Sequence, residues 1–135
     1  MPSEYQIDQA QGLVLSRAWG ALSRADLMSH GEELRKDARF KPHYRQLWDF
    51  TEITKSELTY AELSAMAKVN VFAPTSRRAI LAPVDVVFGM ARMFQMLRES
   101  EGETGIRVFR KRSEALRWLE TGVDLAAPPR GSSPP

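Results

Sequence analysis

The chain has 135 residues, of which 43% are hydrophobic and 27% charged, and its formal net charge is +2. These values are typical of one globular domain, and the apolar runs are far shorter than the roughly 20 residues of a membrane span. The absence of cysteine excludes disulfides, thiolate metal sites and cysteine nucleophiles. Because the N-terminus has no basic segment followed by an apolar one, we expect a cytoplasmic protein.

The chain begins with a predicted β-hairpin. Apolar and polar residues alternate over residues 5–8, a turn ends at Gly12, and a second strand covers residues 13–20. Ser23 then stands where an N-cap is expected, with an acid three residues later, which predicts a helix over residues 24–37.

A largely apolar segment over residues 44–50 predicts the next strand, and its apolar centre indicates an interior position in the sheet. We expect this strand to break at Asp49 and Thr51 and to open onto a loop. In open α/β sheets ligands and partners are met at such strand ends. Asp49, Thr51 and Thr54 are therefore candidate binding residues.

Two further elements follow. Thr59 and Glu62 have the spacing of a capping box, which predicts a helix ending near Val71. Residues 77–82 form a predicted strand that is stopped by Pro83, whose ring removes a backbone donor.

The helix predicted over residues 84–98 has an apolar arc too wide for burial on one side. Methionine suits an adaptable surface, so this helix forms either a homodimer interface or the wall of an apolar pocket, unless its residues only fill the core. Gly89 is interpreted as permitting close helix packing. The apolar residues of the arc are Val84, Val87, Phe88, Met90, Ala91, Met93, Phe94, Met96 and Leu97.

A last strand is predicted over residues 106–109, followed by a helix that opens at Ser113 and ends at Gly122. Residues 1–122 form one domain in this interpretation. The Pro-rich remainder, residues 123–135, is predicted to be disordered. Strands that alternate with helices after a hairpin imply an α/β fold with a mixed, mostly parallel sheet of about five strands and about four helices.

This order of elements, together with short segments, resembles the SpoIIAA-like proteins, a superfamily that includes STAS domains and Sec14-like lipid-transfer domains. The segment Asp49-Phe-Thr-Glu-Ile-Thr54 is similar to the central STAS strand, and Phe109-Arg-Lys-Arg-Ser-Glu-Ala-Leu-Arg-Trp-Leu119 resembles the closing strand and helix. Small bacterial STAS-like proteins are the most similar group. The resemblance implies a non-enzymatic protein-interaction or regulatory module, and its Sec14-like branch implies lipid-like ligands.

In anti-sigma-factor antagonists of this superfamily, a serine that is phosphorylated begins the helix after the central strand. Here that position is the apolar Leu58, and only Thr59 offers a hydroxyl nearby. This departure disfavours a phosphorylation switch. Thr59 has a structural role in any case, because an N-cap stabilises a helix by about 1 kcal/mol.

Other chemistry has little support in the sequence. His30 and His43 stand apart on different elements, so no metal site is expected. No nucleophile elbow and no glycine-rich phosphate loop is present, so we expect no cofactor. A basic cluster lacks a recognition motif and is interpreted as a solvated face, not as a nucleic-acid interface. That cluster consists of Arg107, Arg110, Lys111, Arg112 and Arg117.

Three classes of function stay open at this point. The first is a non-enzymatic module that binds a protein partner, or itself, through the loop at residues 49–59 and the helix at 84–97. The second is a carrier of a small apolar or lipid-like ligand, which predicts a cavity of about 300 to 1,000 Å³. The third is an enzyme using Asp49 with Arg78 or Arg92. The candidate site residues are Asp49, Thr51, Thr54, Thr59, Phe88, Arg92, Met93 and Met96.

Overall fold

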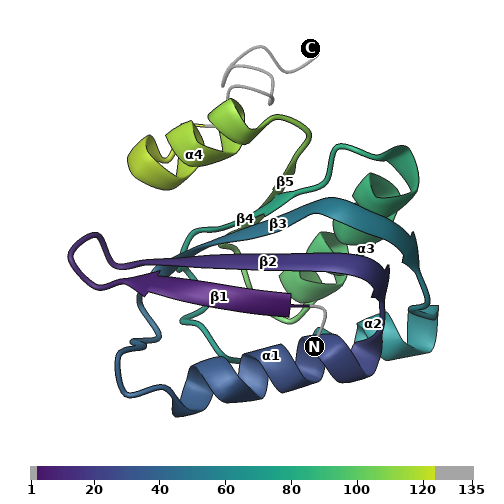
Figure 1. The fold of residues 1–135 in the computed structure, drawn as a ribbon, viewed down its shortest axis with the longest axis horizontal. Helices are drawn as coiled ribbons and strands as arrows, with labels where there is room; N and C mark the ends of the chain where they lie inside the picture. The colour runs from purple at the N-terminus through teal and green to yellow at the C-terminus, as the bar shows by residue number, and fades with distance from the viewer. Residues whose placement is uncertain (1–2, 124–135) are drawn as a thin grey trace.

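The computed structural model describes residues 3–123, which form a five-stranded sheet and four helices (Figure 1). The strands are β1 (Ser3–Asp8), β2 (Leu13–Leu22), β3 (Arg45–Ser56), β4 (Arg78–Leu81) and β5 (Ile106–Phe109). The helices are α1 (Arg24–Lys36), α2 (Tyr60–Met66), α3 (Asp85–Ser100) and α4 (Arg112–Thr121). The predicted tail lies almost wholly outside the described residues.

The strands follow one another across the sheet in chain order, β1-β2-β3-β4-β5. Strands β1 and β2 are antiparallel, and every later neighbour is parallel. All four residues of β4 are buried, as expected for a parallel strand covered on both faces. The predicted α/β class, with an opening hairpin and a mostly parallel sheet, is therefore confirmed.

Helices α1, α2 and α3 lie against one face of the sheet, and α4 lies against the other (Figure 1). The core beneath the three helices includes Phe50, Ile80 and Val87. The core beneath α4 includes Leu47 and Trp118. Each parallel strand thus contributes alternate side chains to two separate apolar layers.

The predicted end of β3 is wrong, because the strand does not stop at Asp49 but continues to Ser56. The reason is that β2 runs on to Leu22 and pairs with β3 over this whole length. The register shifts twice along the pair, since β3 holds one extra residue opposite Arg17–Trp19 and another opposite Gly20–Ala21. Thr51 and Thr54 therefore lie within a strand, not in a loop.

Helix α2 has the predicted capping box: the Thr59 side chain accepts a hydrogen bond from the Glu62 N–H, and the Glu62 side chain accepts one from the Thr59 N–H. The helix ends at Met66 rather than near Val71. Its last turn tightens into bonds between residues three apart, such as Val69 N–H to Met66 carbonyl at 3.1 Å.

Candidate functional site

A cavity of about 330 Å³ lies between the helices α1, α2 and α3 and the sheet. Its lining is mainly apolar, as in most small-molecule sites. Apolar lining residues from these elements include Leu27, Trp48, Phe50, Leu63, Met90 and Phe94. The cavity is therefore built from side chains that the fold turns toward the three-helix face.

Strand β3 supplies the floor of the cavity through its even-numbered residues. Gln46, Trp48 and Phe50 all line it. Successive side chains of a strand point to opposite faces, so the intervening Asp49 is directed to the α4 face. The prediction of Asp49 as a site residue therefore missed its cavity-lining neighbours, although the alternation along the strand distinguishes the two faces.

The mouth of the cavity lies between α1 and the chain that follows α2. The exposed lining residues come from these two segments: Glu32 and Arg35 from α1, and Val69 and Asn70 from the connection to β4. Arg35 donates to both carboxylate oxygens of Glu32, at 2.6 and 2.7 Å, so the two rim charges cancel. A ligand would enter past this neutral pair.

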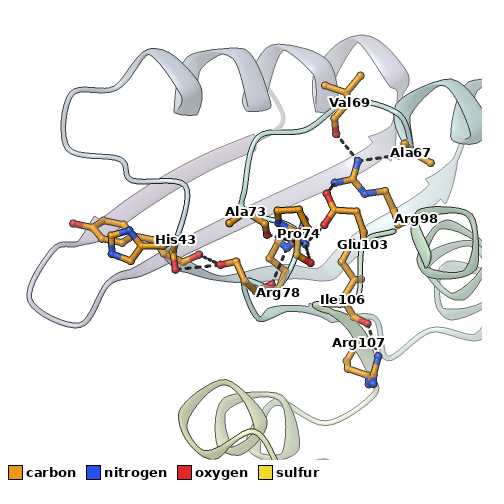
Figure 2. A network of polar contacts seen from close by, with 12 residues as sticks. His43, Ala67, Val69, Ala73, Pro74, Arg78, Arg98, Glu103, Ile106 and Arg107 are labelled. Atoms are coloured by element: carbon orange, nitrogen blue, oxygen red, sulfur yellow. Dashed lines mark hydrogen bonds and ion pairs between the residues drawn. The ribbon is translucent and has the colours of Figure 1, made fainter. Parts of the chain in front are cut away.

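A buried charge cluster stands at one end of the cavity, where Glu103 accepts hydrogen bonds from both Arg78 and Arg98 (Figure 2). Glu103 is 2% exposed and Arg98 3% exposed. Both arginines line the cavity, whereas Glu103 does not. Gly105 follows two residues later, where the loop passes so close to the carbonyl oxygen of Ser76 that an added Cβ atom would overlap it.

The two arginines also hold the segment between α2 and β4 in place. Arg98 donates to the carbonyl oxygens of Ala67, at 3.0 Å, and of Val69 (Figure 2). Arg78 donates to those of Ala73 and Pro74, at 3.4 and 3.3 Å. The Arg98 Nε atom has no hydrogen-bond partner among the described residues, although it is buried.

Burial lowers the pKa of Arg98, and the neighbouring Glu103 carboxylate acts in the opposite direction. A guanidinium stays protonated in proteins, so the shift leaves its charge in place. Two positive charges thus face one buried negative charge in this cluster, and the exposed Glu101 carboxylate also favours the charged form of Arg98.

A second buried polar group, His30, lies in the α1 wall. Its Nε2 atom is 2.9 Å from the Ser16 hydroxyl, which also accepts a hydrogen bond from Gln46. Its ring lies 4.3 Å from the ring of Trp48. Burial lowers the pKa of His30 to about 4, so the imidazole is neutral at physiological pH. His30 therefore contributes hydrogen-bonding groups but no charge to this wall.

The candidate residues of β3 and α2 lie away from the cavity. Asp49 accepts hydrogen bonds from Arg112 of α4 and from the Thr51 N–H. Burial acts to raise the pKa of Asp49, but these hydrogen bonds and the Arg112 charge outweigh it, so the pKa lies below its ordinary value. Thr51 and Thr54 are exposed, and Thr59 caps α2.

Helix α3 divides its apolar residues between two faces. Met90 and Phe94 line the cavity, whereas Met93 and Met96 are 42% and 62% exposed. Phe88 packs against the core beneath the Arg110 guanidinium, whose Cζ lies 4.1 Å from the ring centre. Figure 1 shows α3 lying against the sheet.

Two interpretations of the sequence fail here. A Cβ atom on Gly89 would meet nothing within 4 Å, so this glycine does not serve close helix packing. The structure also separates Asp49 from Arg78, because Asp49 stands beside Leu81 in the register while Arg78 stands beside Gln46. Arg92 is exposed on α3. The acid–arginine pair considered for an enzyme is not assembled.

Among residues 3–123, no helix combines the length and apolar character needed to cross a membrane. Within the same residues, no three His, Asp or Glu side chains are grouped so that they could hold a metal ion.

No family model and no curated protein matches this sequence. Among solved structures, the chain is similar to an uncharacterized protein of the DUF3478 family with a SpoIIAA-like fold, from Shewanella loihica PV-4. The match covers 87% of this chain and 93% of that chain, with 20% sequence identity and a TM-score of 0.55. At this identity the likeness concerns the fold, and it agrees with the strand order and helix layers described above. This chain therefore has a SpoIIAA-like fold.

Proposed function

We propose that the protein binds and carries a small, largely apolar ligand in the cavity between α1, α2, α3 and the sheet. The observation that carries this proposal is the cavity itself, which at about 330 Å³ falls within the range of about 300 to 1,000 Å³ of known ligand sites. Its wall includes Met90 and Phe94 of the methionine-rich helix. A module that only binds a protein partner needs no such space.

Two helix glycines allow a matched test. Gly31 lines the cavity, and a Cβ atom there would make only an ordinary contact, 3.5 Å from Val71. Gly89 faces open space on α3. Replacing either glycine by leucine improves helix propensity by a similar amount, but only Gly31→Leu places a side chain in the cavity.

We expect the wild-type protein and Gly89→Leu to bind the neutral fluorescent probe naphthalene, whose ten carbon atoms suit the volume of the cavity, and Gly31→Leu to bind it at least about tenfold more weakly. Circular dichroism checks that both variants are folded. A native mass spectrum of gently purified protein, compared with the denatured mass, then shows whether a ligand is carried. Equal probe binding by the two variants, or no binding by the wild-type protein, would overturn the proposal.

A second candidate function is binding of a protein partner through the outer face of α3. Val86, Met93 and Met96 are 63%, 42% and 62% exposed on this face, and contiguous exposed apolar residues mark sites of interaction with other proteins. Met93→Glu together with Met96→Glu should abolish self-association or partner capture and leave probe binding unchanged. Retention of every interaction by this double variant would remove the candidate.

A further inference from the structure

The cavity is polar at one end and apolar at the other. Along β3 the lining changes from Gln46 to Trp48 and Phe50, and along β4 from Arg78 to Ile80. Helix α3 runs antiparallel to these strands. The residues through which it lines the cavity change from Arg98 through Phe94 to Met90, so this wall becomes apolar in the same direction as the strands.

The lengths of these walls agree with one another. The four residue steps of strand from Gln46 to Phe50 span about 13 Å, and the eight residue steps of helix from Arg98 to Met90 span about 12 Å. The gradient therefore extends over the whole length of the cavity rather than over one local patch.

The polar end has an excess of positive charge. The buried cluster holds two guanidinium groups and one carboxylate, and both guanidinium groups belong to the lining. The acid at the rim, Glu32, is already bound by Arg35 and Lys36. His30 is neutral, and Glu101, whose carboxylate also acts on Arg98, is exposed and does not line the cavity.

The polar end also has unused hydrogen-bond donors. Arg98 binds through Nη1 and Nη2, which leaves its buried Nε without a partner among the described residues. Arg78 donates through Nε and Nη2, and none of the hydrogen bonds that it donates within residues 3–123 comes from Nη1. Guanidinium donors form their strongest hydrogen bonds with carboxylates and other anions.

We propose that the ligand of this cavity is a single-chain amphipath with an anionic head group. The head group lies against Arg78 and Arg98, and the apolar chain runs along α3 toward Met90. This inference rests on the proposed function, because it names the class of ligand for the same cavity. Rings of the cavity wall flank both cations, with Phe72 near Arg78 and Phe94 near Arg98, and so limit the water that competes for them.

The volume of the cavity sets the size of the probe. At roughly 30 Å³ for each water-sized group, about 330 Å³ holds roughly ten non-hydrogen atoms. Octanoate has that size. The alcohol 1-octanol and the cation octylammonium have the same chain with a neutral and a positive head group, and acetate carries the head group without the chain.

Isothermal titration calorimetry on the wild-type protein with these four compounds tests the inference. We expect octanoate to bind at least about tenfold more tightly than 1-octanol, and octylammonium and acetate to bind more weakly than either. Equal or tighter binding of 1-octanol or octylammonium would overturn the anionic head group while leaving the apolar carrier intact. Binding of none of the eight-carbon compounds would overturn the carrier as well.

Variants locate the head group. Arg78→Gln should lower the affinity for octanoate at least about tenfold and leave the affinity for 1-octanol unchanged. Arg78→Lys should retain part of the preference for octanoate over 1-octanol. Arg117→Gln removes one positive charge from the exposed face of α4 and should change neither of the two affinities. An unchanged ratio of octanoate to 1-octanol affinity in folded Arg78→Gln would overturn the placement. If that variant does not fold, the wild-type series alone decides.

Discussion

The Glu103 carboxylate binds the guanidinium of Arg78, which lies 25 residues earlier in the chain, and both side chains are buried. Removing either partner of a buried ion pair destabilises the fold, because the other partner is left as an uncompensated charge in a medium of low dielectric constant. Glu103 stands between two such charges, those of Arg78 and Arg98. It is therefore the most sensitive position of the cluster.

Replacing this carboxylate should be costly. Glu103→Gln leaves two guanidinium groups buried beside each other, and we expect the free energy of unfolding to fall by about 3 to 5 kcal/mol in urea titrations. The control is Glu99→Gln, which removes an exposed carboxylate 3.7 Å from Arg107 and should change stability by less than about 1 kcal/mol. A similar small loss for both variants would contradict the role assigned to Glu103.

The buried imidazole of His30 makes stability depend on pH. The folded protein holds its pKa at about 4, while the unfolded chain takes up the proton near the ordinary value of 6.5. Stability from the neutral imidazole is therefore fully present above about pH 6.5 and falls as the pH drops toward 4, by about 3 kcal/mol in all.

Urea titrations across this pH range measure the effect. His30→Gln should flatten the decline in the free energy of unfolding between pH 6.5 and pH 4 relative to the wild-type protein. His43→Gln, at an exposed position of the α1–β3 connection, should keep the wild-type slope. A slope in His30→Gln as steep as that of the wild-type protein would show that other groups cause the decline.

The capping box of α2 predicts a smaller effect. Thr59→Ala removes the side-chain acceptor of the Glu62 N–H, which lies 3.1 Å from Thr59 Oγ1, and should lower the free energy of unfolding by about 1 kcal/mol. Thr59→Ser keeps the acceptor and should restore most of this loss. Equal stability of the alanine and serine variants would show that the cap contributes nothing measurable.

Replacement by alanine should change the stability of the protein in opposite directions at two glycines. At Gly105 the added Cβ would overlap the Ser76 carbonyl, so the backbone must shift, and we expect a loss of about 1 to 3 kcal/mol. At Gly31, within α1, the Cβ fits and helix propensity improves by up to about 1 kcal/mol. Thermal unfolding of the two variants compares them directly, and a stabilised Gly105→Ala would refute the steric argument.

Local patterns predicted the order and type of the elements well. The caps at Ser23 and Thr59 and the left-handed Gly122 after α4 act through neighbours in the sequence, and each is present. The end of β3 was missed because β2 sustains it from a distant part of the chain. Strand pairing of this kind overrides local preference.

The cavity was less accessible to sequence reasoning than the fold. The wide apolar arc of residues 84–98 indicated a surplus beyond one core contact, and Met90 and Phe94 from that arc do line the cavity. The charge cluster gave no local signal, because Arg78, Arg98 and Glu103 belong to three different segments. Only the parallel crossover through α3 brings them together.

The same cluster joins three parts of the chain, two of which are also linked by the Thr104 N–H, which donates to the Pro74 carbonyl oxygen at 3.1 Å. Arg98 is anchored in α3, its carbonyl partners Ala67 and Val69 belong to the connection after α2, and Glu103 belongs to the loop before β5. Because Arg98 makes several of these contacts at once, we expect the segments around residues 67–76 and 99–105 to open as one cooperative unit. Their amide protons should exchange with solvent at a common rate, and an anion bound at Arg98 should slow both segments together.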